Sequence, residues 1–281
     1  MRVVAGDPRS RARAFLGQGL KTAAFAADRV RPSPRGVVVL LYHRVGAGSG
    51  LAVDLPVDLF AEQVAALAAT GRVTTLDAAL DALAAPEPPA ADPIVVTFDD
   101  GTADFADHAL PVLERHRVPA CVYVATRYIE HSRAFPAAGT PMSWGALADA
   151  CATGLVTVGS HTHTHALLDR IDPSAVDDEL DRSLVLIGER LGVRAGHFAY
   201  PKALAGSPTA EAAVRARFAS AALAGTRPNE YGTTDPYRLA RSPIQVTDGM
   251  RWFTHKVAGG MAFEDAVRRV ANRARYAGAA H

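Results

Sequence analysis

The sequence is poor in the features that direct a chain to several special classes of protein. It has only 2 cysteines, Cys121 and Cys151, and their apolar or helical surroundings predict small core residues rather than a disulfide or a metal-binding pair. No run of about 18 apolar residues occurs, so we expect no membrane-spanning helix. The formal net charge is +1, which excludes a polyelectrolyte and predicts that nucleic acid is not a partner.

The N-terminal segment also lacks the pattern of a standard secretory signal. Its apolar stretch is short and is interrupted by Gln18 and Lys21, although eight basic residues stand against two acidic ones up to Arg35. Such a segment fits a leader helix packed on the domain, which we favour, or an interfacial helix drawn to anionic lipid. We therefore expect a basic helical leader over residues 1–35, and a protein that is cytoplasmic or peripheral to a membrane.

Strand-like and helix-like segments alternate along the rest of the chain. Fully apolar strands that alternate with helices indicate a parallel sheet covered by helices. Because no internal repeat or break interrupts the pattern, we expect one α/β domain of barrel type over residues 36–281. The expected strands are Val37–Leu41, Ile94–Phe98, Ala120–Val124, Leu155–Gly159, His197–Tyr200 and Leu239–Ile244. The expected helices are Asp58–Ala69, Asp77–Ala84, Ala103–Arg115, Ser143–Thr153 (capped by Ser143), Pro173–Leu191 and Thr209–Phe218.

Polar side chains follow four of these expected strands, each time at the C-terminal end. In parallel α/β barrels the loops at this end carry the chemistry, so a shared site is favoured over scattered surface groups. The residues concerned are His43 and Arg44, then Asp99 and Asp100, then His161, His163 and His165, and finally Tyr200, Pro201 and Lys202.

The histidines suggest a metal site. His161 and His165 are four residues apart, so a helical turn would put both imidazoles on one face, with His163 pointing elsewhere. A carboxylate with two imidazoles is a common catalytic zinc set, although three alternating histidines are also found as adventitious surface clusters. The adjacent aspartates favour the metal.

The pair Asp99–Asp100 ends a buried strand, where two like charges repel with little screening. An Asp-Asp-Gly sequence is ordinary turn chemistry when taken alone. A nearby cation would lower the cost of keeping both carboxylates ionised. One carboxylate can then bind the metal while its neighbour accepts a proton from water.

At this point the sequence resembles the NodB-type polysaccharide deacetylases, carbohydrate esterase family 4. The resemblance rests on Thr97–Gly101 and His161–His165, with weaker support from "LLYHRV", "FAYP" and "DPYRLAR" between Val37 and Ile244. It implies a distorted (β/α) barrel that removes N- or O-acetyl groups from sugars with a divalent metal, foremost Zn²⁺, with Co²⁺ or Ni²⁺ as alternatives. Carried over by position, it implies Asp99 as the base and Asp100, His161 and His165 as the metal ligands.

The sequence departs from the common form of that family in two places. The expected arginine is missing before Pro201, where Ala199 and Tyr200 stand, and no late Leu-x-His motif supplies the catalytic acid. A subgroup that resembles the poly-N-acetylglucosamine deacetylases has a permuted motif order and uses an early histidine as the acid. This makes His43 the acid candidate, with His255 as a possible substitute.

Other assignments are weaker. Arg241 could orient Asp99 in place of the missing arginine, or form a structural ion pair, and the backbone N–H of Lys202 could stabilise an oxyanion. A sugar ring could contact Tyr42, Trp144 and Tyr200, although core packing is the safer expectation for Tyr42 and Trp144.

We therefore expect a metal-dependent carbohydrate deacetylase, acting on N-acetyl groups foremost, with a carbohydrate as substrate. The alternatives are a hydrolase of another C–N bond, such as a cyclic imide or ureide, and a degenerate carbohydrate-binding protein.

Overall fold

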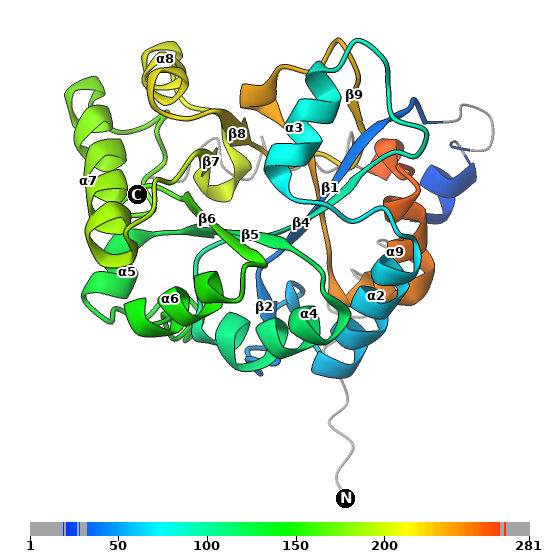
Figure 1. The fold of residues 1–281 in the computed structure, drawn as a ribbon, viewed down its shortest axis with the longest axis horizontal. Coiled ribbons are helices and arrows are strands. Elements are labelled where there is room, and N and C mark those ends of the chain that lie inside the picture. Colours follow the sequence, from blue (N-terminus) through cyan, green and yellow to red (C-terminus); the bar gives the residue numbers. More distant parts are fainter. Residues whose placement is uncertain (1–18, 20, 27, 29–32, 265–266, 268–281) are drawn as a thin grey trace, which may run out of the picture.

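A curled sheet of parallel strands organises the molecule (Figure 1), and the computed structural model describes residues 19, 21–26, 28, 33–264 and 267. The sheet order is β10-β1-β4-β5-β6-β7-β8, and each neighbouring pair along this path is parallel. The strands of this path are β1 (Gly36–Tyr42), β4 (Ile94–Phe98), β5 (Ala120–Val124), β6 (Val156–Ser160), β7 (His197–Ala199), β8 (Ser220–Ala222) and β10 (Arg241–Pro243).

The sheet closes on itself at one place. Ala222 at the end of β8 forms a parallel bridge with Leu239, two residues before β10, and β10 pairs with β1. The closed sheet is a distorted barrel, which confirms the expected fold class. Three short strands lie beside it: β9 (Asn229–Glu230) pairs antiparallel with β1, and β2 (Arg44–Val45) pairs with β3 (Asp54–Leu55).

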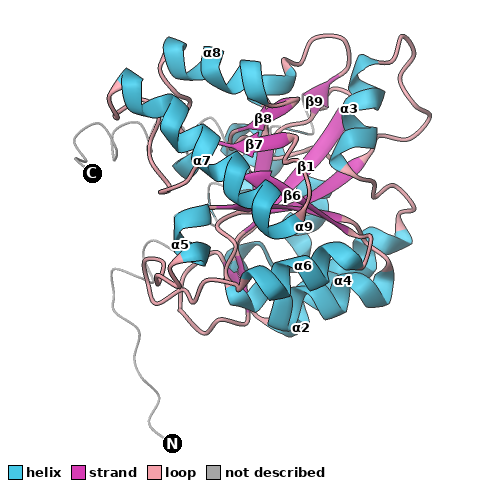
Figure 2. Cartoon of the chain, turned by 60° about the vertical axis from the view of Figure 1, so that its left-hand side comes forward, coloured by secondary structure: helices cyan, strands magenta, loops and turns pink. Residues whose placement is uncertain are grey.

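Helices follow most strands and cover the outside of the barrel. In the view of Figure 1, α2, α4 and α6 lie on one side of the sheet and α3 and α8 on the other, while Figure 2 shows α7 beside α8. The helices are α2 (Val57–Ala69), α3 (Leu76–Ala84), α4 (Leu110–His116), α5 (Thr126–Glu130), α6 (Trp144–Ala152), α7 (Pro173–Leu191), α8 (Pro208–Arg217) and α9 (Gly249–Val257).

The strands alternate between two apolar layers because successive side chains point to opposite faces. In β1, Val38 and Leu40 belong to the outer layer, which packs on α2 and α4, whereas Val37 and Val39 belong to the inner layer. The inner layer is closed by α3 through Leu76 and other apolar side chains. Both layers bury the strands completely, which explains why β4 and β5 read as unbroken apolar runs.

The expected strands and helices recur with small shifts at their ends, and Ser143 caps α6 by accepting a hydrogen bond from the backbone N–H of Ala146 (3.1 Å). The expected helix Ala103–Arg115 divides into a π-helical turn, Phe105–Ala109, and α4. Cys121 and Cys151 are free thiols, in β5 and α6. The helices α5 and α9 and the strand β8 were not expected.

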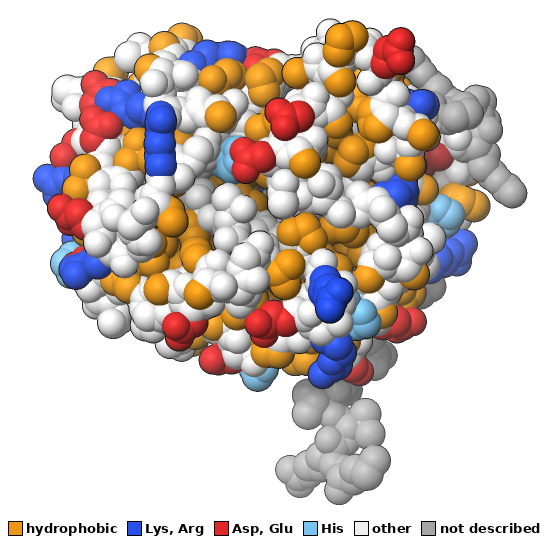
Figure 3. All heavy atoms as spheres, in the orientation of Figure 1, with side chains coloured by type: hydrophobic (Ala, Val, Ile, Leu, Met, Phe, Trp, Pro, Cys, Tyr) orange, Lys and Arg blue, Asp and Glu red, His pale blue; other side chains and the backbone are white. Residues whose placement is uncertain are grey.

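The leader lies largely outside the described residues, so its boundary at residue 35 stays a prediction. Within the described part, residues 21–26 are helical and Lys21 is buried, with an ion pair to Asp248. None of the described helices is both long enough and apolar enough to cross a bilayer. On the face drawn in Figure 3, acidic and basic side chains are interspersed, in agreement with the small net charge.

Candidate metal centre and active site

Three side chains from two loops converge at the C-terminal end of the barrel. Asp100, His161 and His165 each offer one ligand atom, and these atoms all lie within 4.8 Å of one another. The Nε2 atoms of His161 and His165 are 3.7 and 3.4 Å from Oδ1 of Asp100. This spacing suits one oxygen and two nitrogen ligands around a single divalent cation.

The tautomer of His161 also suits a metal ligand. Its Nδ1 lies 2.7 Å from the backbone carbonyl of Ala199, which can only accept a hydrogen bond, so Nδ1 carries the proton and Nε2 turns its lone pair toward Asp100. Burial lowers the pKa of His161 to about 4, which keeps the imidazole neutral near neutral pH. A neutral, oriented imidazole is the form that binds metals.

The histidine loop is irregular rather than helical, so the expected helical turn is wrong. Residues 161–167 form no helix, and Thr162 and His165 both adopt a left-handed φ of 64°. Asp100 is left-handed too, with φ 76°. Non-glycine residues rarely adopt this conformation, and such backbone strain concentrates at functional sites. His161 and His165 are therefore brought together by the left-handed conformations of Thr162 and His165. The four-residue spacing does not predict these conformations.

The side chain of His163 points away from this group. Its Nδ1 lies 2.9 Å from the hydroxyl of Thr126 in α5, and its backbone N–H donates to the carbonyl of Glu179 in α7. His163 thus anchors the histidine loop to two helices and offers no atom to the group of ligands.

The two adjacent aspartates have different partners. Both oxygens of Asp99 accept hydrogen bonds from Arg241, at 2.5 Å from Nη1 and 2.8 Å from Nη2. Burial would raise the pKa of Asp99, but the charge and hydrogen bonds of Arg241 foremost outweigh it and lower the pKa. Asp99 therefore stays ionised next to the ligand group without belonging to it.

The carboxylate of Asp100 is ionised for a related reason. Burial would raise its pKa, but the hydrogen bond of His165 foremost lowers it well below the usual range. The pKa values of both carboxylates are thus lowered despite burial, by Arg241 for Asp99 and by the neighbouring histidines for Asp100.

His43 lies between β1 and β2 at the same end of the barrel. The residue before it, Tyr42, accepts a hydrogen bond from the backbone N–H of Asp99 (3.1 Å), which places His43 next to the aspartate pair. Its Nδ1 is buried and has no hydrogen-bond partner within the described residues. His255, the substitute candidate, lies in α9, where its ring contacts Phe25 at 4.5 Å between centroids.

Three side chains expected near a sugar have other surroundings. Tyr42 is fully buried, stacks on Phe98 (5.3 Å between ring centroids) and donates its hydroxyl hydrogen to Gln63. Tyr200 is buried in the layer between α7 and α8. Both pack in the core, which leaves them no face for a sugar.

Trp144 lies at the start of α6, half-buried, and its Nε1 donates to Glu130 of α5 at 2.7 Å. Lys202 follows the end of β7, where the carbonyl of Ala199 holds His161, and it has a left-handed φ of 52°. The backbone segment from Ala199 to Lys202 therefore borders the ligand group.

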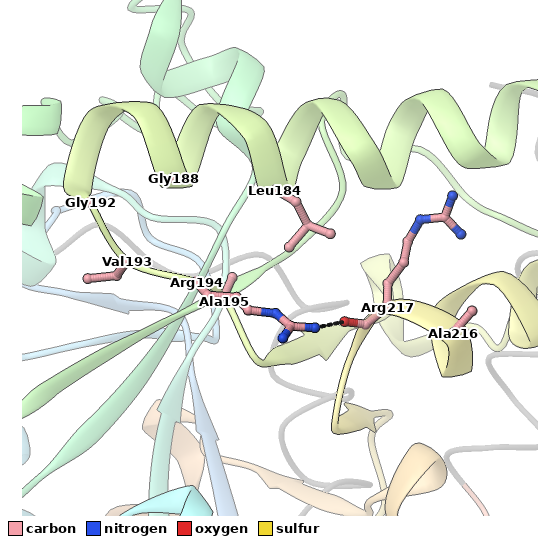
Figure 4. Close-up of a pocket in the computed structure, with 8 residues that line it drawn as sticks. All are labelled: Leu184, Gly188, Gly192, Val193, Arg194, Ala195, Ala216 and Arg217. Carbon is pink, nitrogen blue, oxygen red and sulfur yellow. Dashed lines mark hydrogen bonds between the residues drawn. The ribbon is translucent and has the colours of Figure 1, made fainter.

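A surface hollow of about 480 Å³ lies elsewhere, between the C-terminal half of α7 and the end of α8 (Figure 4). Leu184, Val193 and Ala216 line it, and a hydrogen bond from Arg194 to the backbone carbonyl of Arg217 crosses its floor. None of the residues expected in the site lines this hollow.

Comparisons with known proteins concern the family and the fold. The family model for polysaccharide deacetylase matches residues 87–220. The solved structure of IcaB from Ammonifex degensii has a TM-score of 0.68 and 25% identity, and the match covers 80% of this chain and 98% of that chain.

Two further structures show the same fold at lower identity. The Streptococcus pyogenes deacetylase PplD has a TM-score of 0.68 and 20% identity, with 79% of this chain and 99% of that chain covered. The deacetylase domain of BpsB from Bordetella bronchiseptica has a TM-score of 0.61 and 21% identity, with 76% and 98% covered. No curated protein matches significantly.

Proposed function

We propose that this chain, whose residues 87–220 match the family model for polysaccharide deacetylase, is a metal-dependent carbohydrate deacetylase that acts on N-acetyl groups foremost. One observation carries the proposal. Of two adjacent aspartates, Asp100 converges with His161 and His165, while Asp99 is buried and held by Arg241 just outside that group. This division of roles is what hydrolysis by an activated water requires.

Asp100, His161 and His165 would hold the metal, foremost Zn²⁺, with Co²⁺ or Ni²⁺ as alternatives. When bound, a divalent cation supplies a Lewis acid that makes water a stronger acid and polarises the substrate carbonyl. The fit rests on one anionic oxygen and two imidazole nitrogens within 4.8 Å of one another, one of them from a histidine whose tautomer is fixed by the carbonyl of Ala199.

Asp99 acts as the general base and accepts the proton of the attacking water. Arg241 keeps its carboxylate ionised and fixes the plane of both oxygens, so that proton transfer needs no rearrangement. The same ion pair also weakens Asp99 as a base, because its pKa is lowered. Orientation is gained at the cost of some basicity.

His43 acts as the general acid and donates a proton to the leaving amine. An amine anion is a very poor leaving group, so an amide substrate needs this proton more than an ester does. The backbone N–H of Lys202 donates to the developing oxyanion. Support for both roles comes from position, since His43 lies beside the aspartates and Lys202 follows the segment that holds His161.

The substrate is proposed to be an acetylated carbohydrate. The decisive measurement is acetate release from chito-oligosaccharides by the purified protein, before and after metal removal with a chelator and after metal is restored. We expect release that is lost with the metal and regained with it. Asp99→Asn is the matched control, because it should keep the metal and lose turnover by about 10²-fold or more.

Hydrolysis of a cyclic ureide without acetate release would contradict the substrate class and favour the other C–N hydrolase. Sugar binding without hydrolysis of either compound would favour the degenerate carbohydrate-binding protein.

The basic N-terminal residues are proposed to support peripheral contact with anionic lipid, in keeping with a protein that is cytoplasmic or peripheral to a membrane. Six of the eight basic residues lie outside the described part of the chain, and for these the argument rests on charge alone. Lys21 and Arg35 are paired with Asp248 and Asp92, so they are not counted toward lipid contact.

A further inference from the structure

The guanidinium of Arg241 has an aromatic neighbour that the proposed reaction does not use. Arg241 is completely buried, and its Nε donates to the carbonyl of Leu223 while both terminal nitrogens donate to Asp99. The Cζ of Arg241 lies over the ring of Tyr123 in β5, 5.1 Å from the ring centroid. The hydrogen bonds fix the edge of the guanidinium, and the ring covers one of its faces.

The ring of Tyr123 is itself seated on a glycine. Tyr123 and Gly159 are directly paired across β5 and β6. A Cβ at position 159 would lie 2.5 and 2.7 Å from Cδ1 and Cε1 of Tyr123, distances that real Cβ atoms essentially never show. Because residue 159 is a glycine, the ring of Tyr123 can lie against its backbone, and from this position the ring contacts Arg241.

The hydroxyl of Tyr123 does not explain why an aromatic residue stands there. It is buried, and the group it interacts with is the thiol of Cys121, which is only a weak hydrogen-bonding group. Such a weak interaction does little to offset the cost of burying a hydroxyl, so the main contribution of Tyr123 is expected from its ring.

We propose that Tyr123 is a positioning residue, whose ring, seated on Gly159, holds the guanidinium of Arg241 in the plane from which it reaches both oxygens of Asp99. This inference rests on the proposed function, because it concerns the orientation of the proposed base. Tyr123 contacts neither the substrate nor the ligand group and acts through Arg241.

The physical reason is the geometry of the paired hydrogen bonds, here called the fork, that the two terminal nitrogens of Arg241 donate to Asp99. Two parallel N–H···O bonds require the guanidinium and the carboxylate to share a plane. A cation over an aromatic face is strongly attracted in a desolvated site, and the flat ring also blocks rotation out of that plane. A smaller aliphatic side chain would leave room beside the guanidinium, so it could tilt and lose one oxygen of Asp99.

The test compares Tyr123→Phe with Tyr123→Leu. Tyr123→Phe keeps the ring and removes only the hydroxyl and its weak interaction with Cys121, so we expect kcat on chito-oligosaccharides within about twofold of the wild type and a nearly unchanged melting temperature. Tyr123→Leu should lower kcat by about tenfold or more, the scale of a desolvated cation–π contact, while KM and metal content change little.

A double-mutant cycle separates positioning from general packing. Arg241→Lys keeps the charge but removes the fork, so adding Tyr123→Leu to it should cost little further kcat. A packing role predicts the opposite, namely the same loss of kcat in both backgrounds, and that result would overturn the proposal. Equal losses in Tyr123→Phe and Tyr123→Leu would overturn it as well.

Crystal structures of the metal-free variants give a readout that does not depend on activity. Arg241 should contact both oxygens of Asp99 in Tyr123→Phe and at most one in Tyr123→Leu. Should Tyr123→Leu fail to fold, Tyr123→Met removes the flat ring while it keeps more of the buried volume, and it should move Arg241 in the same way. An unmoved Arg241 in whichever of these variants folds refutes the proposal.

A wild-type protein that releases no acetate would defeat the proposed function alone. The crystallographic comparison would still decide whether Tyr123 positions Arg241.

Discussion

Two clusters of buried charge lie in different parts of the molecule, and they use their charges differently. The cluster proposed to be catalytic, called the catalytic cluster below, comprises Asp99, Asp100, His161, His165 and Arg241. The leader cluster comprises Lys21, Asp248 and Lys256, and joins the leader to α9. Both contain carboxylates whose pKa is lowered by neighbouring cations despite burial.

The leader cluster is closed. Asp248 accepts from Lys21 through one oxygen and from Lys256 through the other (2.8 Å), and Lys256 also donates to the carbonyl of Pro243. All three side chains are at most 2% exposed. Each charged group of the leader cluster is paired with another group of the protein. The cluster can therefore hold two segments together, but no charged atom remains available to bind a ligand.

The catalytic cluster is open on one side. The side chains of Asp100 and His165 are 19% and 22% exposed, and the ligand atoms of Asp100, His161 and His165 face one another within 4.8 Å. Buried charge alone therefore does not mark a functional site. The difference lies in atoms that converge on a common point and remain reachable from solvent.

Removing one metal ligand from the catalytic cluster should have the largest effect on activity. His161→Ala and His165→Ala should each lose the bound metal and all measurable acetate release, because two ligands do not retain the cation. Elemental analysis of the purified variants measures the metal directly. His163→Ala is the control, since this side chain points to Thr126, and it should keep most of the metal. A stoichiometric metal signal in His161→Ala would sink the assignment.

A smaller loss is expected on removing the acid. His43→Ala should keep the metal and lower kcat on amide substrates by about 10² to 10⁴-fold. Activated acetate esters should suffer less, because their leaving groups need no proton. The alkaline fall of kcat/KM should flatten, since that fall reports the loss of the acid's proton. Equal losses on amide and ester substrates would assign His43 a structural role.

The leader cluster should respond in stability rather than in turnover. Asp248→Asn leaves Lys21 and Lys256 buried without their carboxylate, and we expect a loss of about 3 kcal/mol in the free energy of unfolding at pH 7. Asp178→Asn is the matched control. Asp178 pairs with Arg182 on the surface of α7, and its loss should cost less than about 0.5 kcal/mol. Urea unfolding measures both.

The pH dependence has a definite sign. The folded-state pKa of Asp248 is below its unfolded value of about 3.9, because Lys256 and Lys21 outweigh the effect of burial. Its contribution is therefore complete above about pH 4 and is lost as the pH falls through the folded-state value. The stability difference between wild type and Asp248→Asn should shrink in that acid range, and a difference that grew there would contradict the pairing.

Truncation of the N-terminus should have the smallest effect on stability and turnover. It should also show which residues of the leader contribute to the folded domain. A protein lacking residues 1–18 keeps Lys21, so its melting temperature and soluble-substrate turnover should match the full chain. A protein lacking residues 1–30 loses Lys21 and should melt at a lower temperature. Both should bind anionic vesicles less, as measured by co-sedimentation. An equal melting temperature for both truncations would show that Lys21 adds no stability.

Sequence patterns predicted the barrel well because its strands are buried on both faces. The bounds of β4 and β5 were predicted without error, since apolar runs between turn residues leave little ambiguity. The helix α9 was missed because its sequence mixes Arg251, His255 and Lys256 with apolar residues and begins at a glycine.

The site was predictable in its residue types and less so in its geometry. The convergence of Asp100, His161 and His165 could be expected from strand ends that meet at one edge of the barrel. The left-handed residues that produce it have no sequence signature, and histidine spacing suggested a helix. The contact of Lys21 with Asp248 could not be predicted, because 227 positions separate the two residues and no local pattern connects them.

The side chain of Arg241 has a mechanical consequence as well. The barrel closes between β8 and β10 through the bridge of Ala222 with Leu239. The side chain of Arg241, in β10, donates hydrogen bonds to the carbonyl of Leu223, just after β8, and to Asp99, just after β4. One side chain thus acts as a brace across the barrel. Any screen that scores variants at this position by product yield will mix loss of the brace with loss of chemistry, and abundance must be measured separately for each variant.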